Sequence, residues 1–155
     1  MFSASEILDL AVRIEENGER FYRQALEKIT EPSLMVMLRS VADDEVRHRE
    51  WFLNLKKRGE LQKEDRLFKV ISGALLQDAV DDHGFSLDTV DFSTIPDEKS
   101  LLEVAIGFEQ DSIAFYEILG GFVENGDTLK HLVSIIEEEK RHIDLLEERI
   151  SVLVM

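Results

Sequence analysis

The sequence predicts an all-α fold, a four-helix bundle made of two antiparallel helical hairpins joined by a long crossover. Three observations predict it. Only two prolines and eight glycines interrupt the 155 residues, which favours long helices. Four segments place their apolar residues at alternating steps of three and four, the spacing of one helix face that packs in a bundle. The two halves of the chain also resemble each other at a constant offset of 94 residues.

The first hairpin is expected over about residues 3–59. Its first helix should run from about Ser3 to Thr30, because Ser3 and Glu6 match the S-x-x-E capping box. Its second helix should begin near Pro32, a residue favoured in the first helical turn, and end near Gly59. The inward stripes of these two helices are Leu8, Ala11, Glu15, Gly18, Tyr22, Ala25 and Ile29, and then Leu34, Leu38, Val41, Glu45, His48, Phe52 and Leu55.

The crossover is expected over about residues 60–97. It is long enough for the chain to cross the length of the bundle. Long loops without structure are uncommon in compact domains, so we expect a short helix near residues 69–80 within it. Nothing in this segment indicates a second domain, and residues 1–155 are predicted to form a single domain.

The second hairpin is expected over about residues 98–155. Its first helix should start between Asp97 and Ser100 and end at Gly120-Gly121. Its second helix should start after Asn125-Gly126-Asp127, with Asp127 as the capping residue. The inward stripes are Leu102, Ala105, Glu109, Ser112, Tyr116 and Leu119, and then Leu132, Ile135, Glu139, His142, Leu146 and Ile150.

The repeat relates the two hairpins residue by residue. The offset that takes Phe21-Tyr22 to Phe115-Tyr116 also takes DDEVRH (43–48) to EEEKRH (137–142). An internal repeat of this kind predicts two similar hairpins related by pseudo-twofold symmetry.

Composition excludes several classes of function. With 18 Lys and Arg against 33 Asp and Glu, the chain carries a net charge of −15, which disfavours nucleic acid and anionic membrane surfaces as partners. The absence of cysteine excludes disulfides, thiolate metal sites, iron–sulfur clusters and a cysteine nucleophile. No apolar run is long enough to span a membrane, and the N-terminus does not match a signal peptide, so we expect a cytoplasmic protein.

Each of the four apolar stripes carries a glutamate near its middle, and two of them carry a histidine three residues later. A carboxylate in a bundle core is costly unless it is paired or bound to a cation. Two divalent cations would balance four such carboxylates, and oxygen and nitrogen donors without sulfur suit iron or manganese, with zinc as a further option. The residues of this predicted two-metal site are Glu15, Glu45, His48, Glu109, Glu139 and His142.

The local sequences around these residues resemble the rubrerythrin branch of the ferritin-like di-iron carboxylate proteins. IEENGERFY (14–22) and FEQDSIAFY (108–116) resemble that branch's first and third helices, and DDEVRH and EEEKRH its second and fourth. The resemblance covers the four helices, which make up nearly all of the chain except the crossover. It implies that Glu45 and Glu139 bridge two iron ions.

The resemblance also assigns the remaining ligands. It implies that Glu15 and His48 complete the shell of one iron ion and that Glu109 and His142 complete that of the other. Two departures from rubrerythrin accompany it. The chain has no cysteines for a rubredoxin-type iron domain, and Ser112 occupies the position of an additional glutamate ligand.

The function implied by the resemblance is that of an oxidoreductase. A di-iron centre would reduce peroxide, or dioxygen, with electrons from an external donor such as a rubredoxin, and the chain would form a homodimer, with exchange of helices between chains left open. Two alternatives stay open: a ferroxidase that handles iron itself, and a non-catalytic acidic helical module that binds a partner protein.

Four further residues are candidates for contacts with the metal ligands. Tyr22 and Tyr116 lie two turns after Glu15 and Glu109 on the same faces, where each could pack in the core with a satisfied hydroxyl or hydrogen-bond to a ligand carboxylate. Asp44 and Glu138 could orient a ligand histidine of the facing helix, or be solvated. We interpret His83 and His131 as surface residues, and Trp51 and Phe52 as packing residues.

Overall fold

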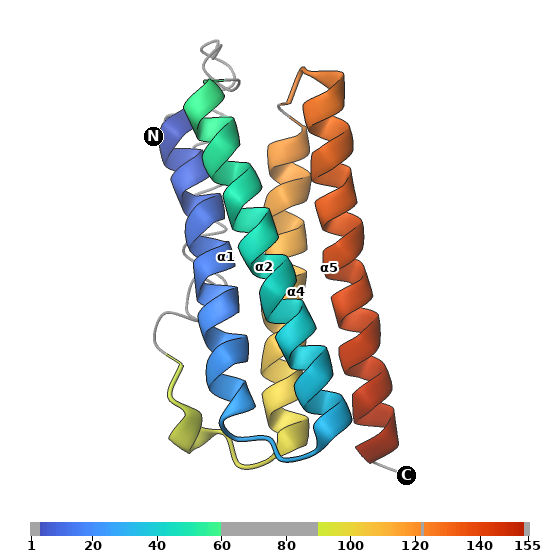
Figure 1. The fold of residues 1–155 in the computed structure, drawn as a ribbon. Coiled ribbons are helices and arrows are strands. Elements are labelled where there is room, and N and C mark those ends of the chain that lie inside the picture. The colour runs from blue at the N-terminus through green and yellow to red at the C-terminus, as the bar shows by residue number, and fades with distance from the viewer. Residues whose placement is uncertain (1–3, 60–89, 122, 154–155) are drawn as a thin grey trace.

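The four predicted helices are present and run along a common axis (Figure 1). The structure, a computed structural model, describes residues 4–59, 90–121 and 123–153. The elements are α1 (Ala4–Leu26), α2 (Pro32–Arg58), the short 3₁₀ helix η2 (Phe92–Thr94), α4 (Glu98–Gly120) and α5 (Gly126–Leu153). The expected helix at 69–80, the capping residue Ser3 and His83 lie outside the described residues.

Side-chain caps explain where α2 and α4 begin. The carboxylate of Glu31 accepts hydrogen bonds from the backbone amides of Ser33 (3.2 Å) and Leu34 (2.7 Å) at the start of α2. The carboxylate of Asp97 accepts one from the amide of Ser100 (2.8 Å) at the start of α4. At the end of α2, Gly59 adopts a left-handed conformation (φ 66°), which glycine reaches without the steric cost of a Cβ.

Two details of the predicted boundaries were wrong. α1 ends at Leu26 rather than near Thr30, because the amides of Glu27 and Lys28 bond to carbonyls three residues back, at 3.1 and 3.0 Å, and tighten the chain into a turn. The cap of α5 is Asn125 rather than Asp127. Its Oδ1 accepts from the amides of Asp127 and Thr128, both at 3.0 Å, so Asp127 already lies in the first turn.

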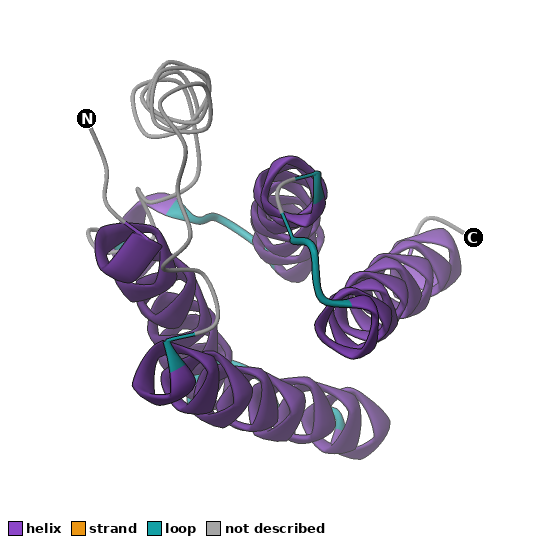
Figure 2. Ribbon diagram, turned by 90° about the horizontal axis from the view of Figure 1, so that it is seen from above, coloured by secondary structure: helices purple, strands orange, loops and turns teal. Residues whose placement is uncertain are grey.

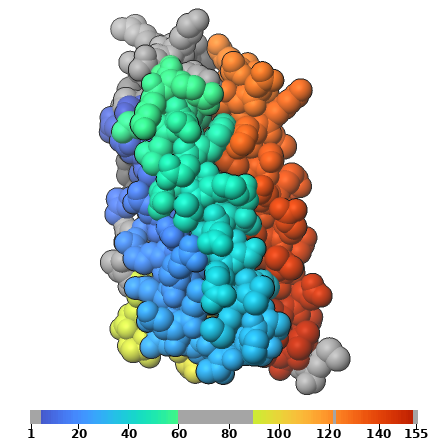
Figure 3. All heavy atoms as spheres, viewed as in Figure 1, coloured from blue at the N-terminus to red at the C-terminus, as the bar shows by residue number. Residues whose placement is uncertain are grey.

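The bundle consists of two hairpins, α1–α2 and α4–α5, packed face to face (Figure 2). Every residue of the four predicted stripes is buried except Ile150, which is half-buried. The faces that the periodicity predicted therefore form the interior. Helices α2 and α5 lie side by side on one face of the molecule (Figure 3). Within the described residues, no helix is long and apolar enough to cross a membrane.

Candidate metal centre

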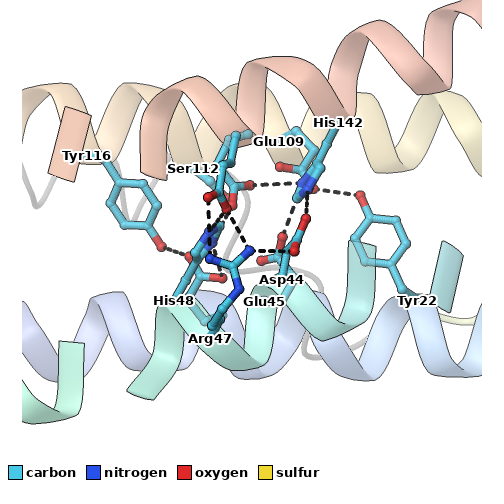
Figure 4. A network of polar contacts seen from close by, with 12 residues as sticks. Tyr22, Asp44, Glu45, Arg47, His48, Glu109, Ser112, Tyr116 and His142 are labelled. Carbon is cyan, nitrogen blue, oxygen red and sulfur yellow. Dashed lines mark hydrogen bonds and ion pairs between the residues drawn. The ribbon is translucent and has the colours of Figure 1, made fainter. Parts of the chain in front are cut away.

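The six predicted ligands meet in one layer at the middle of the bundle (Figure 4). Each helix supplies a glutamate, and α2 and α5 each add a histidine one turn later, so that both side chains of a pair face the same place. All six residues are at most 1% exposed. The apolar stripes on either side of this layer exclude water from it.

The ligand atoms fall into two overlapping groups. Glu15, Glu45, His48 and Glu139 form one group, and Glu45, Glu109, Glu139 and His142 form the other; within each group the potential ligand atoms lie within 4.8 Å of one another. Glu45 and Glu139 belong to both groups. Two carboxylates shared in this way are in position to bridge two cations.

Many polar atoms of this layer have no hydrogen-bond partner. Buried polar atoms are rarely left without one, because each costs about 1–3 kcal/mol. The atoms without a hydrogen-bond partner are Glu15 Oε2, both oxygens of Glu45, His48 Nδ1, Glu109 Oε2, both oxygens of Glu139 and His142 Nδ1, although His48 Nδ1 lies 2.8 Å from Glu139 Oε1, within ion-pair distance. All of them are potential metal ligands that face the same space, so the donor set fits two metal ions.

The electrostatics of the layer also point to missing positive charge. Burial, together with the neighbouring carboxylates, raises the pKa of Glu45 and of Glu139 well above the usual value. Burial alone would lower the pKa of His48, but Glu139 and Glu15 outweigh it and raise that pKa to about 11. In the same way, Asp44 and Glu109 raise the pKa of His142 to about 10. Without a cation, protons partly neutralise the cluster.

A second carboxylate orients each histidine. His48 Nε2 lies 2.7 Å from Glu138 Oε2, and His142 Nε2 lies 2.9 Å from Asp44 Oδ2. When the Nε2–H donates to these carboxylates, Nδ1 keeps its lone pair directed at the cluster, as a metal ligand requires. Each pair joins one hairpin to the other. The prediction that Asp44 and Glu138 hold a histidine of the facing helix is confirmed as a contact.

The two tyrosines also connect the hairpins. The hydroxyl of Tyr22 on α1 donates to Glu109 Oε1 on α4 (2.7 Å), and that of Tyr116 on α4 donates to Glu15 Oε1 on α1 (2.5 Å). Both side chains are fully buried. The two alternatives left open for these residues therefore hold together, because each ring packs in the core and its hydroxyl is satisfied by a glutamate of the cluster.

The remaining residues singled out in the sequence lie beside the cluster or away from it. Ser112 is buried, and its hydroxyl donates to the Phe108 carbonyl (3.0 Å), so it offers no carboxylate. Phe52 is buried in the core, as predicted. His131 is exposed, as predicted, and stacks on the half-buried Trp51 with ring centroids 4.5 Å apart.

Sequence reasoning missed the importance of Gly18 on α1. A Cβ at this position would lie 2.9 Å from Glu45 Oε2 and 2.9 Å from Phe108 Cε1, so only glycine leaves room for the Glu45 carboxylate. A signal was present, because glycine in a helix interior costs about 1 kcal/mol relative to alanine and therefore points to a close approach.

Comparisons with known proteins agree with this geometry. The Rubrerythrin family model matches residues 6–77, which include most of α1 and all of α2. Among solved structures, the chain is similar to a candidate ferritin-like diiron-carboxylate protein from Thermotoga maritima, with 29% identity and a TM-score of 0.69 over 97% of this chain and 95% of that one. No curated protein matches the chain. The family match and the structural match support the rubrerythrin-like branch of the ferritin-like proteins.

Proposed function

We propose that the chain holds two iron ions at this cluster and reduces hydrogen peroxide, or dioxygen, with electrons from an external donor. The observation that carries the proposal is the pair of overlapping ligand groups that share Glu45 and Glu139. The similarity to the Rubrerythrin model supports peroxide as the oxidant. Bound iron would supply the two electrons that reduce the O–O bond, and the protein would supply geometry and charge.

The donor set supports iron as the metal. Each group offers three carboxylates and one imidazole, without sulfur, a combination that suits iron, with manganese or zinc as further options. Four carboxylates balance two divalent cations. The related Thermotoga maritima structure is itself described as a candidate diiron-carboxylate protein, which supports the same assignment.

The surrounding residues would keep the ligands in place and in the right protonation state. Asp44 and Glu138 accept the Nε2–H of the two histidines and leave each Nδ1 free to ligate. Burial and the nearby Glu109 raise the pKa of Tyr22 well above 10, so its hydroxyl keeps its proton and remains a hydrogen-bond donor at neutral pH. Burial and Glu15 have the same effect on the pKa of Tyr116.

An external electron donor is part of the proposal. Residues 1–155 contain no cysteine, so they cannot form the thiolate-bound iron centre that reduces the di-iron site in rubrerythrin itself. A rubredoxin is the class of donor that the resemblance implies. The resemblance also leads us to propose a homodimer, which light scattering of the purified protein would test.

Anaerobic titration with Fe(II), followed by stopped-flow mixing with one equivalent of peroxide or of dioxygen, tests the proposal. We expect binding to saturate at about two ions per chain, as the two ligand groups require. Peroxide should oxidise the bound iron much faster than dioxygen does, and added rubredoxin with its reductase should restore the reduced spectrum. Glu45→Gln should no longer bind two ions stoichiometrically. The control Glu16→Gln, which changes an exposed residue next to the ligand Glu15 on α1, should still bind two.

Two other outcomes would replace the proposal. If dioxygen is preferred and iron added beyond two ions per chain is oxidised and retained, the ferroxidase alternative replaces the proposal. If no stoichiometric Fe(II) binding is found, the di-iron proposal fails; if manganese and zinc are not bound either, the non-catalytic acidic helical module replaces it.

A further inference from the structure

Arg47 on α2, which is labelled in Figure 4, contacts both carboxylates that orient the histidines. Its Nη2 lies 2.5 Å from Asp44 Oδ1 and 3.0 Å from Glu138 Oε2, and its Nη1 lies 3.3 Å from Glu138 Oε1. Asp44 precedes it on the same helix, whereas Glu138 belongs to α5. One guanidinium group therefore joins the two hairpins beside the cluster.

Each of these carboxylates also holds one histidine. Asp44 contacts Arg47 through Oδ1 and His142 through Oδ2, and Glu138 Oε2 receives both Arg47 and His48. The two histidines belong to different ligand groups. A single carboxylate residue thus separates Arg47 from each of the two ligand histidines.

We propose that Arg47 is a positioning residue that holds both histidines in register and so sets the metal affinity of the two positions together. The effect on metal affinity rests on the proposed metal binding, whereas the positioning of the histidines does not. Asp44 and Glu138 bear the same charge and share Arg47 Nη2, and their side chains are only 24% and 19% exposed. Without the guanidinium they repel each other, and a carboxylate that rotates away releases its histidine ring.

The chemistry of arginine suits this position. Its planar group presents several donors in fixed directions, and it can engage two carboxylates at the same time, whereas a lysine ammonium acts as a point charge. The side chain of Arg47 is 60% exposed. Its effect should therefore weaken as salt is added, because exposed charges are screened.

The pseudo-twofold symmetry supplies a matched control. The repeat equates Arg47 with Arg141, which also precedes a ligand histidine. Arg141 is exposed and makes no ion pair within the described parts of the chain. Of these two equivalent arginines, only Arg47 contacts both Asp44 and Glu138.

Cobalt(II) titration of the metal-free protein, followed by absorption spectroscopy, measures the effect on both positions. We expect Arg47→Ala to weaken both by about 3- to 10-fold, less than the 10- to 100-fold typical when the direct partner of a ligand is removed. Arg141→Ala should leave both affinities unchanged. Asp44→Asn should weaken mainly the position that contains His142, and Arg47→Lys should restore part of the loss.

Nuclear magnetic resonance of ¹⁵N-histidine-labelled, metal-free protein provides a readout without metal. The Nε2–H protons of His48 and His142 should both exchange with water faster in Arg47→Ala than in the wild type or in Arg141→Ala. Unchanged exchange at both histidines, or a change at only one of them, would overturn the inference. So would a lower melting temperature of Arg47→Ala without any change in cobalt affinity.

The two proposals fail in different ways. If the wild type binds no metal, the proposed function is wrong, and the exchange measurement still decides whether Arg47 holds both histidines. If the wild type binds two ions and Arg47→Ala binds them equally well, only the inference about Arg47 is wrong.

Discussion

Removal of metal should destabilise the fold by an amount that the two ligand groups allow us to estimate. An ion that binds only the native state, at a free concentration of about 100 times its dissociation constant, stabilises that state by about 2.7 kcal/mol. Two ions therefore contribute about 5 kcal/mol. In a domain of this size 1 kcal/mol corresponds to about 2–4 °C, so chelation should lower the melting temperature by about 10–20 °C.

Differential scanning calorimetry at pH 7 measures this difference on protein prepared anaerobically with Fe(II) and then with a chelator. Glu45→Gln should narrow the gap between the two states, because it removes one buried negative charge and one shared ligand. Glu16→Gln, on the exposed side of α1, should leave the gap unchanged. A melting temperature indifferent to the chelator, in protein shown to have lost its metal, would refute the reasoning.

Three further predictions concern the surroundings of the cluster. Tyr22→Phe and Tyr116→Phe should each lower the free energy of unfolding of the metal-free protein by about 1–3 kcal/mol, because each leaves a buried carboxylate oxygen without its donor. Urea titrations measure this difference, and equal midpoints of the variants and the wild type would contradict the prediction. The melting temperature of the metal-free protein should fall as the pH rises from 5 to 9. The raised pKa values of Glu45, Glu139 and His48 mean that the native state binds protons that the unfolded state releases. A melting temperature that rises over this range would count against this prediction. Gly18→Ala should weaken metal binding in a cobalt titration. The control is Gly107→Ala on α4, where a Cβ meets nothing within 4 Å; it should leave metal binding unchanged and stabilise the helix by up to about 1 kcal/mol. Equal cobalt affinities of the two variants would argue against crowding at Glu45.

The sequence predicted the helices and the cluster because both depend on periodicity. A stripe at steps of three and four specifies which face of a helix is buried, and a charged residue within it must meet its counterparts from the other helices. Glu15 and Glu109 could therefore be placed in one layer from sequence alone. Asp44 and Glu138 directly precede the glutamates of the two E-x-x-H pairs, which suggested contact with a histidine of the facing helix as one of two alternatives, and the structure shows that contact.

The features that could not be predicted from the sequence depend on how the helices pack and on the path of the backbone between them. Arg47 and Arg141 occupy equivalent positions of the repeat, and only the packing of α2 against α5 makes one of them span two carboxylates. Gly18 is adjacent to Glu45 only once α1 and α2 are docked. The choice between Asn125 and Asp127 as the cap depends on the backbone path of a short turn, to which both residue types are suited.

The groups that orient four of the ligands, Glu15, His48, Glu109 and His142, come from the opposite hairpin. This arrangement has a consequence for the order of events during synthesis. The first hairpin contains Glu15, Glu45 and His48 and could capture an ion as soon as it emerges from the ribosome. It lacks Tyr116 and Glu138, which fix Glu15 and His48 and are made later. We expect an ion acquired at that stage to be held loosely and to exchange, so that the final choice of metal is made only after the second hairpin has docked.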